Sequence, residues 1–413
     1  MRAGAARVAG RSLRTRLTVR YRLTPWWAKV LAIFAASRVV TTSLLLGFAS
    51  IQGPNPWTGA APGYFDFARL WDGNWYNIIA VAGYPSTVPI TADGHVGESA
   101  WAFMPGYPAL VRLLIVFGID FGVAGVLVST AFALGTALVF YRLMLLFLPP
   151  QAALFSVVLF CVAPLSPILQ VAYAESMFLF LLVVALFLLV QRRYWVLIPV
   201  VAAMSVTRPG VLAFALVLLL HVIHRWWLDR RGREAFPARE RVAAIVAGFS
   251  SAVLGLAWVL IAGLVTGRIT AYLDTELAWR SVYIGYDDLV PFTPWFRAAS
   301  WWAGWWGVPA VLLILALVLL IALCAVLLFV PPVRRLGVDI RFWLASYGLY
   351  LLAVFFPQSS TFRLLMPLFP ALGALAQPRS TVYRVVLVAL CILGQWAWID
   401  IAWWVNGRDW TPP

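Results

Sequence analysis

Residues 27–51, WAKVLAIFAASRVVTTSLLLGFASI, form an apolar run long enough to cross a lipid bilayer as one helix. The tail before this run, residues 1–22, carries seven arginines and no acidic residue. Because basic segments stay on the cytoplasmic side of a membrane, we expect residues 1–26 to be a cytoplasmic anchor. An arginine-rich transit peptide is the alternative. The first helix then delivers residues 52–104 to the outer side.

The composition places the whole chain in a membrane. Of the 413 residues, 63% are hydrophobic and only 11% are charged, which is typical of a polytopic membrane protein. Much of the net charge of +15 lies in short segments beside apolar runs, where arginine sets orientation, so it does not indicate nucleic-acid binding. The three cysteines lie inside apolar runs, and no cysteine or histidine cluster has the spacing of a metal site.

Further apolar runs predict an all-α bundle of about eleven transmembrane helices within residues 27–404. The runs are 121–141, 151–170, 173–190, 195–206, 210–224, 242–265, 307–330, 341–356, 364–376 and 383–404. Basic connections, which we assign to the cytoplasm, lie at 191–194, 225–241, 331–341 and 377–384. Counting membrane crossings outward from these cytoplasmic connections places a second long loop, 266–304, on the outer side with loop 52–104. The same count places the C-terminal tail, 405–413, on the outer side.

Two segments do not fit simple spans. Residues 104–119 contain two prolines and an arginine and are shorter than the roughly 20 residues that a span needs. We interpret this segment as a re-entrant or interfacial helix. Residues 195–224 are either two short spans or one helix broken at TRPG (207–210). Because irregular backbone at membrane depth must be buried in protein or line a wet cavity, we expect a cavity near Arg208.

A carboxylate in an aromatic setting follows the first span. The stretch ARLWDGNWYNIIAVAGYPS (68–86) is too polar to span a bilayer and places Asp72 between tryptophan and tyrosine residues. One interpretation is that Asp72 is a helix N-cap, with Trp75 and the following apolar residues facing lipid. The other is a general base that deprotonates a hydroxyl group. Asp66 is the competing candidate, although it can also pair with Arg69.

Other charged residues near span ends are candidates because charge in a membrane is costly. Glu98 and Glu175 are candidate catalytic or positioning residues, and Glu175 could instead complement a helix N-terminus. Arg208 and Arg363 stand at predicted helix breaks, where they could reach the interface or bind a phosphate as a fork. In loop 266–304 we interpret the tryptophans first as an interfacial belt and second as a sugar-binding site. We interpret Asp287 and Asp288 as solvated loop residues rather than as a pair of metal ligands.

Several motifs together resemble one family. LWDGNWYNIIAVAGY (70–84), WAFMPGYPALVRLL (101–114), APLSPILQVAYAESMFLFLL (163–182), TRPGVL (207–212) and FRLLMPLFPALGAL (362–375) are similar, in this order, to motifs of the PIG-V-type mannosyltransferases. These comprise the GPI mannosyltransferase II family and its bacterial relatives in the GT-C superfamily. A single lysine beside thirty arginines indicates a GC-rich bacterial genome. Departures from the family pattern fall at Met104 and Gly106.

The resemblance implies a GT-C fold and transfer of mannose from a polyprenyl-phosphate-mannose donor, with inversion, to an extracytoplasmic glycolipid or lipoglycan. It implies that Asp72 is the catalytic aspartate, and it places Glu175, Arg208 and Arg363 on family motif positions. We expect sugar or lipid contacts from Trp71, Trp75, Tyr76, Tyr107 and Tyr173. The donor is a substrate, so no cofactor and no metal are expected. The expected location is the bacterial plasma membrane, with the site on the outer side.

Two functions other than catalysis remain open from the sequence. A carrier or flippase for a lipid-linked precursor would need similar lipid contacts but would show internal symmetry, and we find no internal repeat. A noncatalytic subunit of a glycosylation complex is the third possibility, against which the presence of Asp72 counts.

Overall fold

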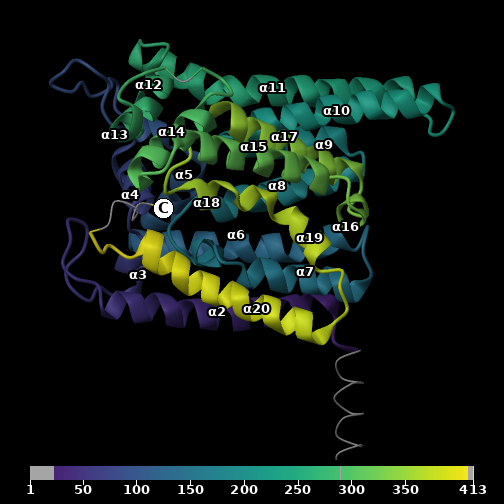
Figure 1. The fold of residues 1–413 in the computed structure, drawn as a ribbon, viewed down its shortest axis with the longest axis horizontal. Helices are drawn as coiled ribbons and strands as arrows, with labels where there is room; N and C mark the ends of the chain where they lie inside the picture. The colour runs from purple at the N-terminus through teal and green to yellow at the C-terminus, as the bar shows by residue number, and fades with distance from the viewer. Residues whose placement is uncertain (1–22, 289, 408–412) are drawn as a thin grey trace, which may run out of the picture.

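The computed structural model describes residues 23–288, 290–407 and 413, and this part of the chain is predominantly helical. Within the described residues, β-structure is limited to an isolated bridge between Ile90 and Val96. The long helices run side by side along one direction and form a single bundle (Figure 1). The predicted fold class, an all-α polytopic membrane protein, is confirmed.

Within the described residues, six helical segments are long and apolar enough to cross a membrane. They are α2 (Trp26–Ser50), α6 (Phe121–Met144), α10 (Val211–Arg230), α11 (Ala238–Thr266), α15 (Ala310–Leu327) and Thr381–Trp403, which joins α20 (Thr381–Trp398) to the π-helical turn η4 (Ile399–Trp403). Shorter apolar helices include α5 (Gly106–Ile115), α7 (Pro150–Val162), α8 (Glu175–Val190) and α9 (Tyr194–Ser205). Helix α17 (Val338–Val354) packs against α10.

Two predicted spans are wrong as continuous helices. The run 151–170 is helical only to Val162, and a short 3-10 helix, η2 (Ser166–Gln170), follows it. The run 364–376 consists of α18 (Thr361–Leu364), a 3-10 helix, η3 (Met366–Ala371), and α19 (Leu372–Leu375). Prolines explain both breaks, because proline lacks the amide hydrogen of the helical ladder and its ring clashes with the preceding turn.

Residues 195–224 form two helices that run in opposite directions. The Tyr194 hydroxyl, at the start of α9, lies 2.9 Å from Nε2 of His221 in the middle of α10. These residues are 27 positions apart, which in one helix would separate them by about 40 Å at 1.5 Å per residue. The chain therefore reverses direction at residues 206–210, and these residues separate two helices, of which α9 is short and α10 has 20 residues.

Helix α5 is too short to cross a bilayer. Its 10 residues span about 15 Å, half of the apolar thickness of a typical membrane. It lies between α4 (Asp72–Ala82) and α6 and buries Tyr107 and Val111 against them. That residues 104–119 are re-entrant or interfacial remains a prediction, with which this length is compatible.

The two ends of the bundle differ in what they carry. One end holds α3 (Tyr64–Phe67), α4, α12 (Ala271–Ala278), α13 (Ser281–Ile284) and α14 (Pro294–Trp306) (Figure 1). The basic turn between α10 and α11 and the basic helix α16 (Pro331–Arg334) lie at the opposite end. The predicted outer loops thus share one end. Of the predicted tails, residues 1–22 and 408–412 lie outside the described residues.

Candidate active site

Four charged side chains from distant parts of the sequence meet in one cluster, which we call the charged cluster: Asp72, Glu175, Arg208 and Arg363. Nη1 of Arg363 forms an ion pair with Oδ2 of Asp72. Nε of Arg363 lies 3.3 Å from Oε1 of Glu175, and Nη1 of Arg208 donates to the same oxygen at 2.7 Å. Glu175 therefore holds both arginines, and one of them contacts Asp72.

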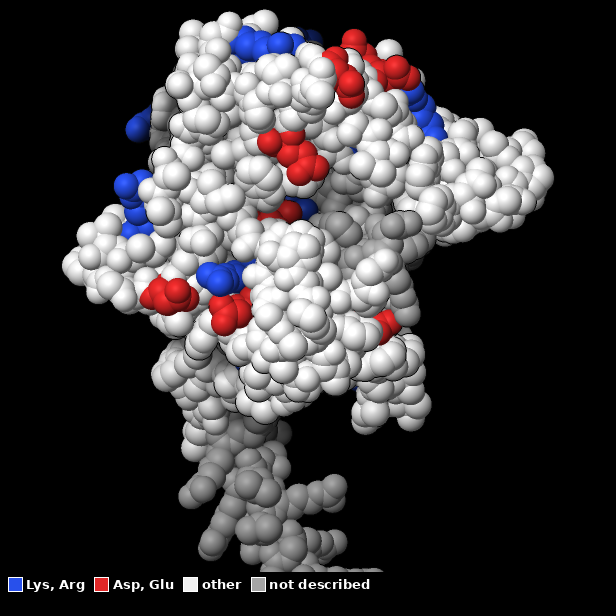
Figure 2. Space-filling model, turned by 90° about the vertical axis from the view of Figure 1, so that its left-hand side faces the viewer, with Lys and Arg blue, Asp and Glu red and all other residues white. Residues whose placement is uncertain are grey.

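The charged cluster is largely removed from solvent. Glu175 is 3% exposed and Arg363 is 8% exposed. An isolated charge at such a depth is costly, whereas two acidic and two basic groups compensate one another. Oε2 of Glu175 is buried without a hydrogen-bond partner among the described residues. Figure 2 shows the end of the bundle that carries α4 and α12, with acidic and basic side chains inside a hollow near its middle.

The backbone before Asp72 has an unusual conformation. Trp71 has φ of 57°, which a bulky residue adopts only when its surroundings impose it. The Trp71 Nε1 donates to the Trp403 carbonyl oxygen at 2.9 Å, and the Asp72 amide donates to the Tyr173 hydroxyl at 3.1 Å. Helix α4 begins at Asp72 itself, without a side-chain cap. The N-cap interpretation of Asp72 is therefore wrong, because its carboxylate pairs with Arg363 instead.

Close backbone packing positions Arg208. The Gly106 amide, at the start of α5, donates to the Val206 carbonyl oxygen at 2.6 Å. A Cβ at Gly106 would lie 2.7 Å from that oxygen, so this approach requires glycine. The departure from the family pattern at Gly106 thus coincides with a contact that fixes the turn ahead of Arg208.

Glu175 and Arg363 are held by their local structure. Glu175 is the first residue of α8, where the helix dipole favours a carboxylate, so the structural and functional interpretations of this residue are compatible. Arg363 lies in α18, ahead of the proline-broken segment η3, and its Cζ lies 5.3 Å from the centre of the Tyr173 ring.

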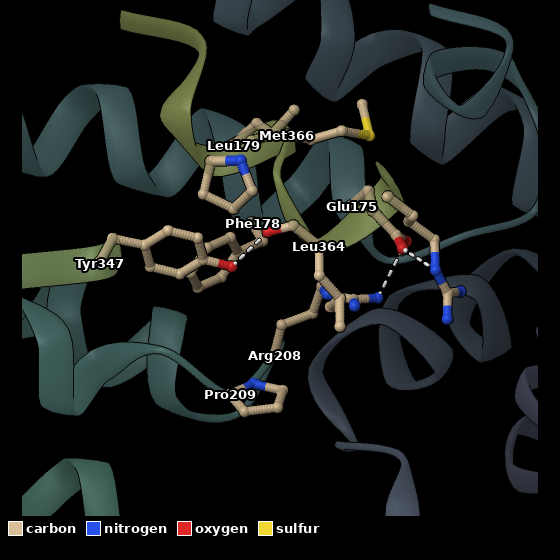
Figure 3. Close-up of a pocket in the computed structure, with 10 residues that line it drawn as sticks. Glu175, Phe178, Leu179, Arg208, Pro209, Tyr347, Leu364 and Met366 are labelled. Atoms are coloured by element: carbon tan, nitrogen blue, oxygen red, sulfur yellow. Dashed lines mark hydrogen bonds and ion pairs between the residues drawn. The ribbon is translucent and has the colours of Figure 1, made fainter. Parts of the chain in front are cut away.

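A narrow cavity of about 240 Å³, including its open mouth, lies beside the charged cluster (Figure 3). Glu175, Arg208 and Arg363 form its polar wall, and apolar residues, with Tyr347 and Pro209, form the rest. The expected cavity near Arg208 is therefore present. A larger groove of about 640 Å³, including its open mouth, shares Leu179 and Met366 with it. This second groove is almost wholly apolar and runs between η2 and η3.

Most of the aromatic residues that we expected to contact sugar or lipid pack against one another near Asp72. Tyr76, Tyr107 and Tyr173 are buried, and the rings of Tyr107 and Tyr173 both pack edge-on against Tyr76. The Tyr107 hydroxyl donates to the Gly125 carbonyl oxygen at 2.9 Å, which gives it a structural role. Trp75 is half-buried and stacks on Phe103.

Other candidates lie apart from the charged cluster. Asp66 forms an ion pair of 3.1 Å with Arg69, and its side chain is 55% exposed. Glu98 has an exposed side chain. In loop 266–304, the carboxylate of Asp287 lies 2.7 Å from Arg297. Among the described residues, no group of three or more histidine, cysteine and acidic side chains could hold a metal ion.

Helix α12 is part of the site region that the sequence did not single out. Its Glu276 forms an ion pair of 3.2 Å with Arg280. Burial raises the pKa of the Glu276 carboxyl, while Arg280, the Tyr272 hydroxyl and Arg208 act to lower it and Asp72 acts to raise it. A glutamate four residues before an arginine is a common helical pair, so the pattern alone gives no functional signal.

Comparison with protein families agrees with this site. The family described as Mannosyltransferase (PIG-V) matches residues 32–269, which is more than half of the chain. The chain belongs to this family. The matched segment includes three members of the charged cluster, Asp72, Glu175 and Arg208. Membership in the PIG-V family implies that the protein is a membrane-embedded glycosyltransferase that transfers mannose. Comparison with curated protein sequences gave no match.

Proposed function

We propose that this PIG-V family member transfers mannose from a polyprenyl-phosphate-mannose donor to a hydroxyl group of an extracytoplasmic glycolipid or lipoglycan. Asp72 acts as the general base, and Arg208 and Arg363 bind the donor phosphate. The observation that carries the proposal is the ion pair of Asp72 with Arg363. It places a carboxylate beside a guanidinium that is also held by Glu175, so a base and an anion-binding group are neighbours.

The chemistry of the donor requires both groups. The acceptor oxygen attacks the anomeric carbon of mannose while the bond from that carbon to the phosphate oxygen breaks. The acceptor proton passes to the Asp72 carboxylate. The polyprenyl phosphate leaves with one more negative charge than it had as a diester, and two arginines stabilise that charge. Attack opposite to the leaving phosphate inverts the anomeric carbon.

Donor binding also frees the base in this scheme. In the structure Arg363 neutralises Asp72, and the phosphate offers the same arginine a second anion. When the guanidinium turns to the phosphate, the carboxylate is released to accept a proton. The enzyme then activates the acceptor only after the donor has bound.

The apolar groove beside the cavity supports a lipid-linked donor. It joins the polar cavity at Leu179 and Met366 and is lined by carbon side chains such as Leu169, Leu368 and Phe369. A phosphate held by Arg208 and Arg363 would direct its isoprenoid chain into this groove, where burial of apolar surface stabilises the chain. A nucleotide-linked donor would meet few polar partners there.

We further propose that the site faces the outside of a bacterial plasma membrane. The charged cluster lies toward the end of the bundle that carries loops 52–104 and 266–304, and the basic connections lie at the other end. The positive-inside rule assigns that basic end to the cytoplasm. Cysteine labelling of intact cells at exposed positions of loop 52–104 tests this orientation, and labelling only after lysis would contradict it.

The activity itself is tested with the purified full-length protein in lipid nanodiscs. Radiolabelled polyprenyl-phosphate mannose and a membrane lipid extract are supplied, and label in glycolipid is measured. We expect transfer by the wild type, a loss of at least about 100-fold for Asp72→Asn, and near wild-type rates for Asp66→Asn, a matched exposed control. Absence of transfer in nanodiscs, together with label that crosses the membrane of vesicles that contain the same protein, would overturn the proposal in favour of a carrier.

A further inference from the structure

Helix α12 is held against α11 and against η1 (Ala100–Ala102), which belongs to the first outer loop. Its Thr275 hydroxyl lies 3.2 Å from the Ser99 hydroxyl, just before η1. The neighbouring Trp101 packs on Trp258 of α11, and the Trp258 Nε1 donates to the Trp101 carbonyl oxygen at 3.1 Å. The two outer loops therefore pack against each other at α12 and η1.

Three rings form an aromatic corner where α12 meets α4: Trp75, Phe103 and Trp279. Trp75 and Phe103 are stacked, with centroids 5.7 Å apart and planes 15° apart. Trp279 stands edge-on to both, at 5.6 Å from Trp75 and 6.0 Å from Phe103. Trp75 lies three residues after Asp72, so both occupy the same face of α4. The corner thus borders the proposed base, and its rings are only partly buried.

The aromatic corner contains a polar group without a partner. The Nε1 of Trp279 is buried and makes no hydrogen bond within the described residues. Buried donors of this kind are usually satisfied by a protein group, a water molecule or a ligand. A hydroxyl-rich ligand at the corner would supply the missing acceptor.

A carboxylate and a guanidinium stand one turn from the aromatic corner. Glu276 precedes Trp279 by three residues and pairs with Arg280 at 3.2 Å. The charges of Asp72 and Arg208 act on Glu276, which places it within electrostatic range of the charged cluster. Because Glu276 and Arg280 neutralise each other, they add no net charge and suit an uncharged ligand.

We propose that α12 forms a subsite for a six-membered polyol ring of the acceptor, a pyranose or a cyclitol, whose reacting hydroxyl faces Asp72. The inference rests on the proposed mannosyl transfer and names the acceptor class. The C–H face of such a ring stacks on the aromatic corner, since the electron-rich faces of aromatic rings attract C–H groups. Glu276 accepts hydrogen bonds from ring hydroxyls, and the Trp279 Nε1 donates one.

The test uses full-length protein in nanodiscs, saturating radiolabelled polyprenyl-phosphate mannose, and three acceptor probes: octyl α-mannoside, an octyl ether of inositol, and octan-1-ol. The wild type should use at least one ring probe and discriminate against octan-1-ol. Whether it prefers the mannoside or the inositol ether decides between the pyranose and the cyclitol. For Trp279→Ala and Glu276→Gln we expect the KM for the ring probe to rise about tenfold, with kcat changed less than threefold.

Two controls make the result interpretable. Trp195→Ala removes a 57% exposed tryptophan of α9, a helix that contributes no residue to the aromatic corner. This variant should leave the KM for the ring probe and kcat unchanged. Trp279→Phe keeps an aromatic ring and should recover part of the lost affinity, which a merely destabilised fold would not show.

Three outcomes would overturn the subsite. Equal use of octan-1-ol and ring probes would show that no ring is recognised. Unchanged kinetics of Trp279→Ala, with an active wild type, would leave mannosyl transfer standing without this subsite. A rise in the KM for the donor instead of the acceptor would place the donor sugar at the corner. Absence of transfer by the wild type to any probe or lipid extract would refute the proposed function itself.

Discussion

Asp72 and Arg363 lie 291 positions apart in the chain, yet the guanidinium of Arg363 donates to the carboxylate of Asp72. The contact joins the start of α4 to α18, and Glu175 supports it from α8. Because Arg363 serves two carboxylates, removal of any partner changes the charge balance of the others.

Arg363→Lys is expected to lower the transfer rate by about 100-fold, because an ammonium group cannot form the planar fork that binds a phosphate. The measurement is kcat/KM for the polyprenyl-phosphate-mannose donor. Arg69→Lys, which alters a partly exposed arginine paired with Asp66, is the control and should stay near the wild type. A rate for Arg363→Lys within twofold of the wild type would rule out a forked contact with the phosphate.

Glu175→Gln should destabilise the protein by about 3 kcal/mol, because it leaves two buried arginines with one carboxylate between them. A phosphate would replace the missing charge. Thermal unfolding is measured with and without polyprenyl phosphate, and we expect the ligand to raise the Tm of the variant more than that of the wild type. If the ligand stabilises both equally, the arginines that Glu175 holds are not the phosphate site.

Gly106→Ala is expected to cost about 1–3 kcal/mol in unfolding free energy, because the added methyl group would overlap the Val206 carbonyl oxygen. Activity should fall as well, since the displaced turn carries Arg208. Gly47→Ala adds the same group in open space on α2 and should be neutral or slightly stabilising. Similar stability and activity in the two variants would show that the turn moves without consequence.

Transfer is expected to continue in the presence of EDTA. The leaving group is a lipid phosphate whose developing charge is met by two arginines, so a divalent cation has less to contribute. Initial rates are compared in buffer with EDTA, without it, and after addition of excess magnesium or manganese. Loss of activity in EDTA with recovery on adding metal would contradict this expectation.

Glu276 should make stability depend on pH. Burial raises its pKa in the folded state above the ordinary 4.5, so the folded protein holds this proton where the unfolded chain has lost it. The wild type therefore loses stability as pH rises from 4.5 through the raised pKa. Glu276→Gln removes this titration, so its Tm relative to the wild type should increase over that window. A constant difference in Tm would show that Glu276 is not perturbed.

Local sequence properties predicted much of the fold. Apolar length defined α2, α6 and α11, and it did so because burial in a bilayer depends on composition over about 20 residues and not on neighbours in space. The same rule failed at 151–170 and 364–376, where hydropathy continues through prolines that end the helix. The prolines were visible in the sequence, but only the structure shows that the segments they interrupt line a groove.

By itself, the sequence determined that this chain is a polytopic helical membrane protein with a carboxylate after its first span, and its motifs indicated the family. The tertiary structure decided which charges meet. Asp72 and Arg363 pair, whereas Asp66 turns to Arg69, and α12 brings Glu276 and Trp279 to the site region. The reason is physical: membrane insertion follows from local composition, but an ion pair between distant segments depends on how the helices pack.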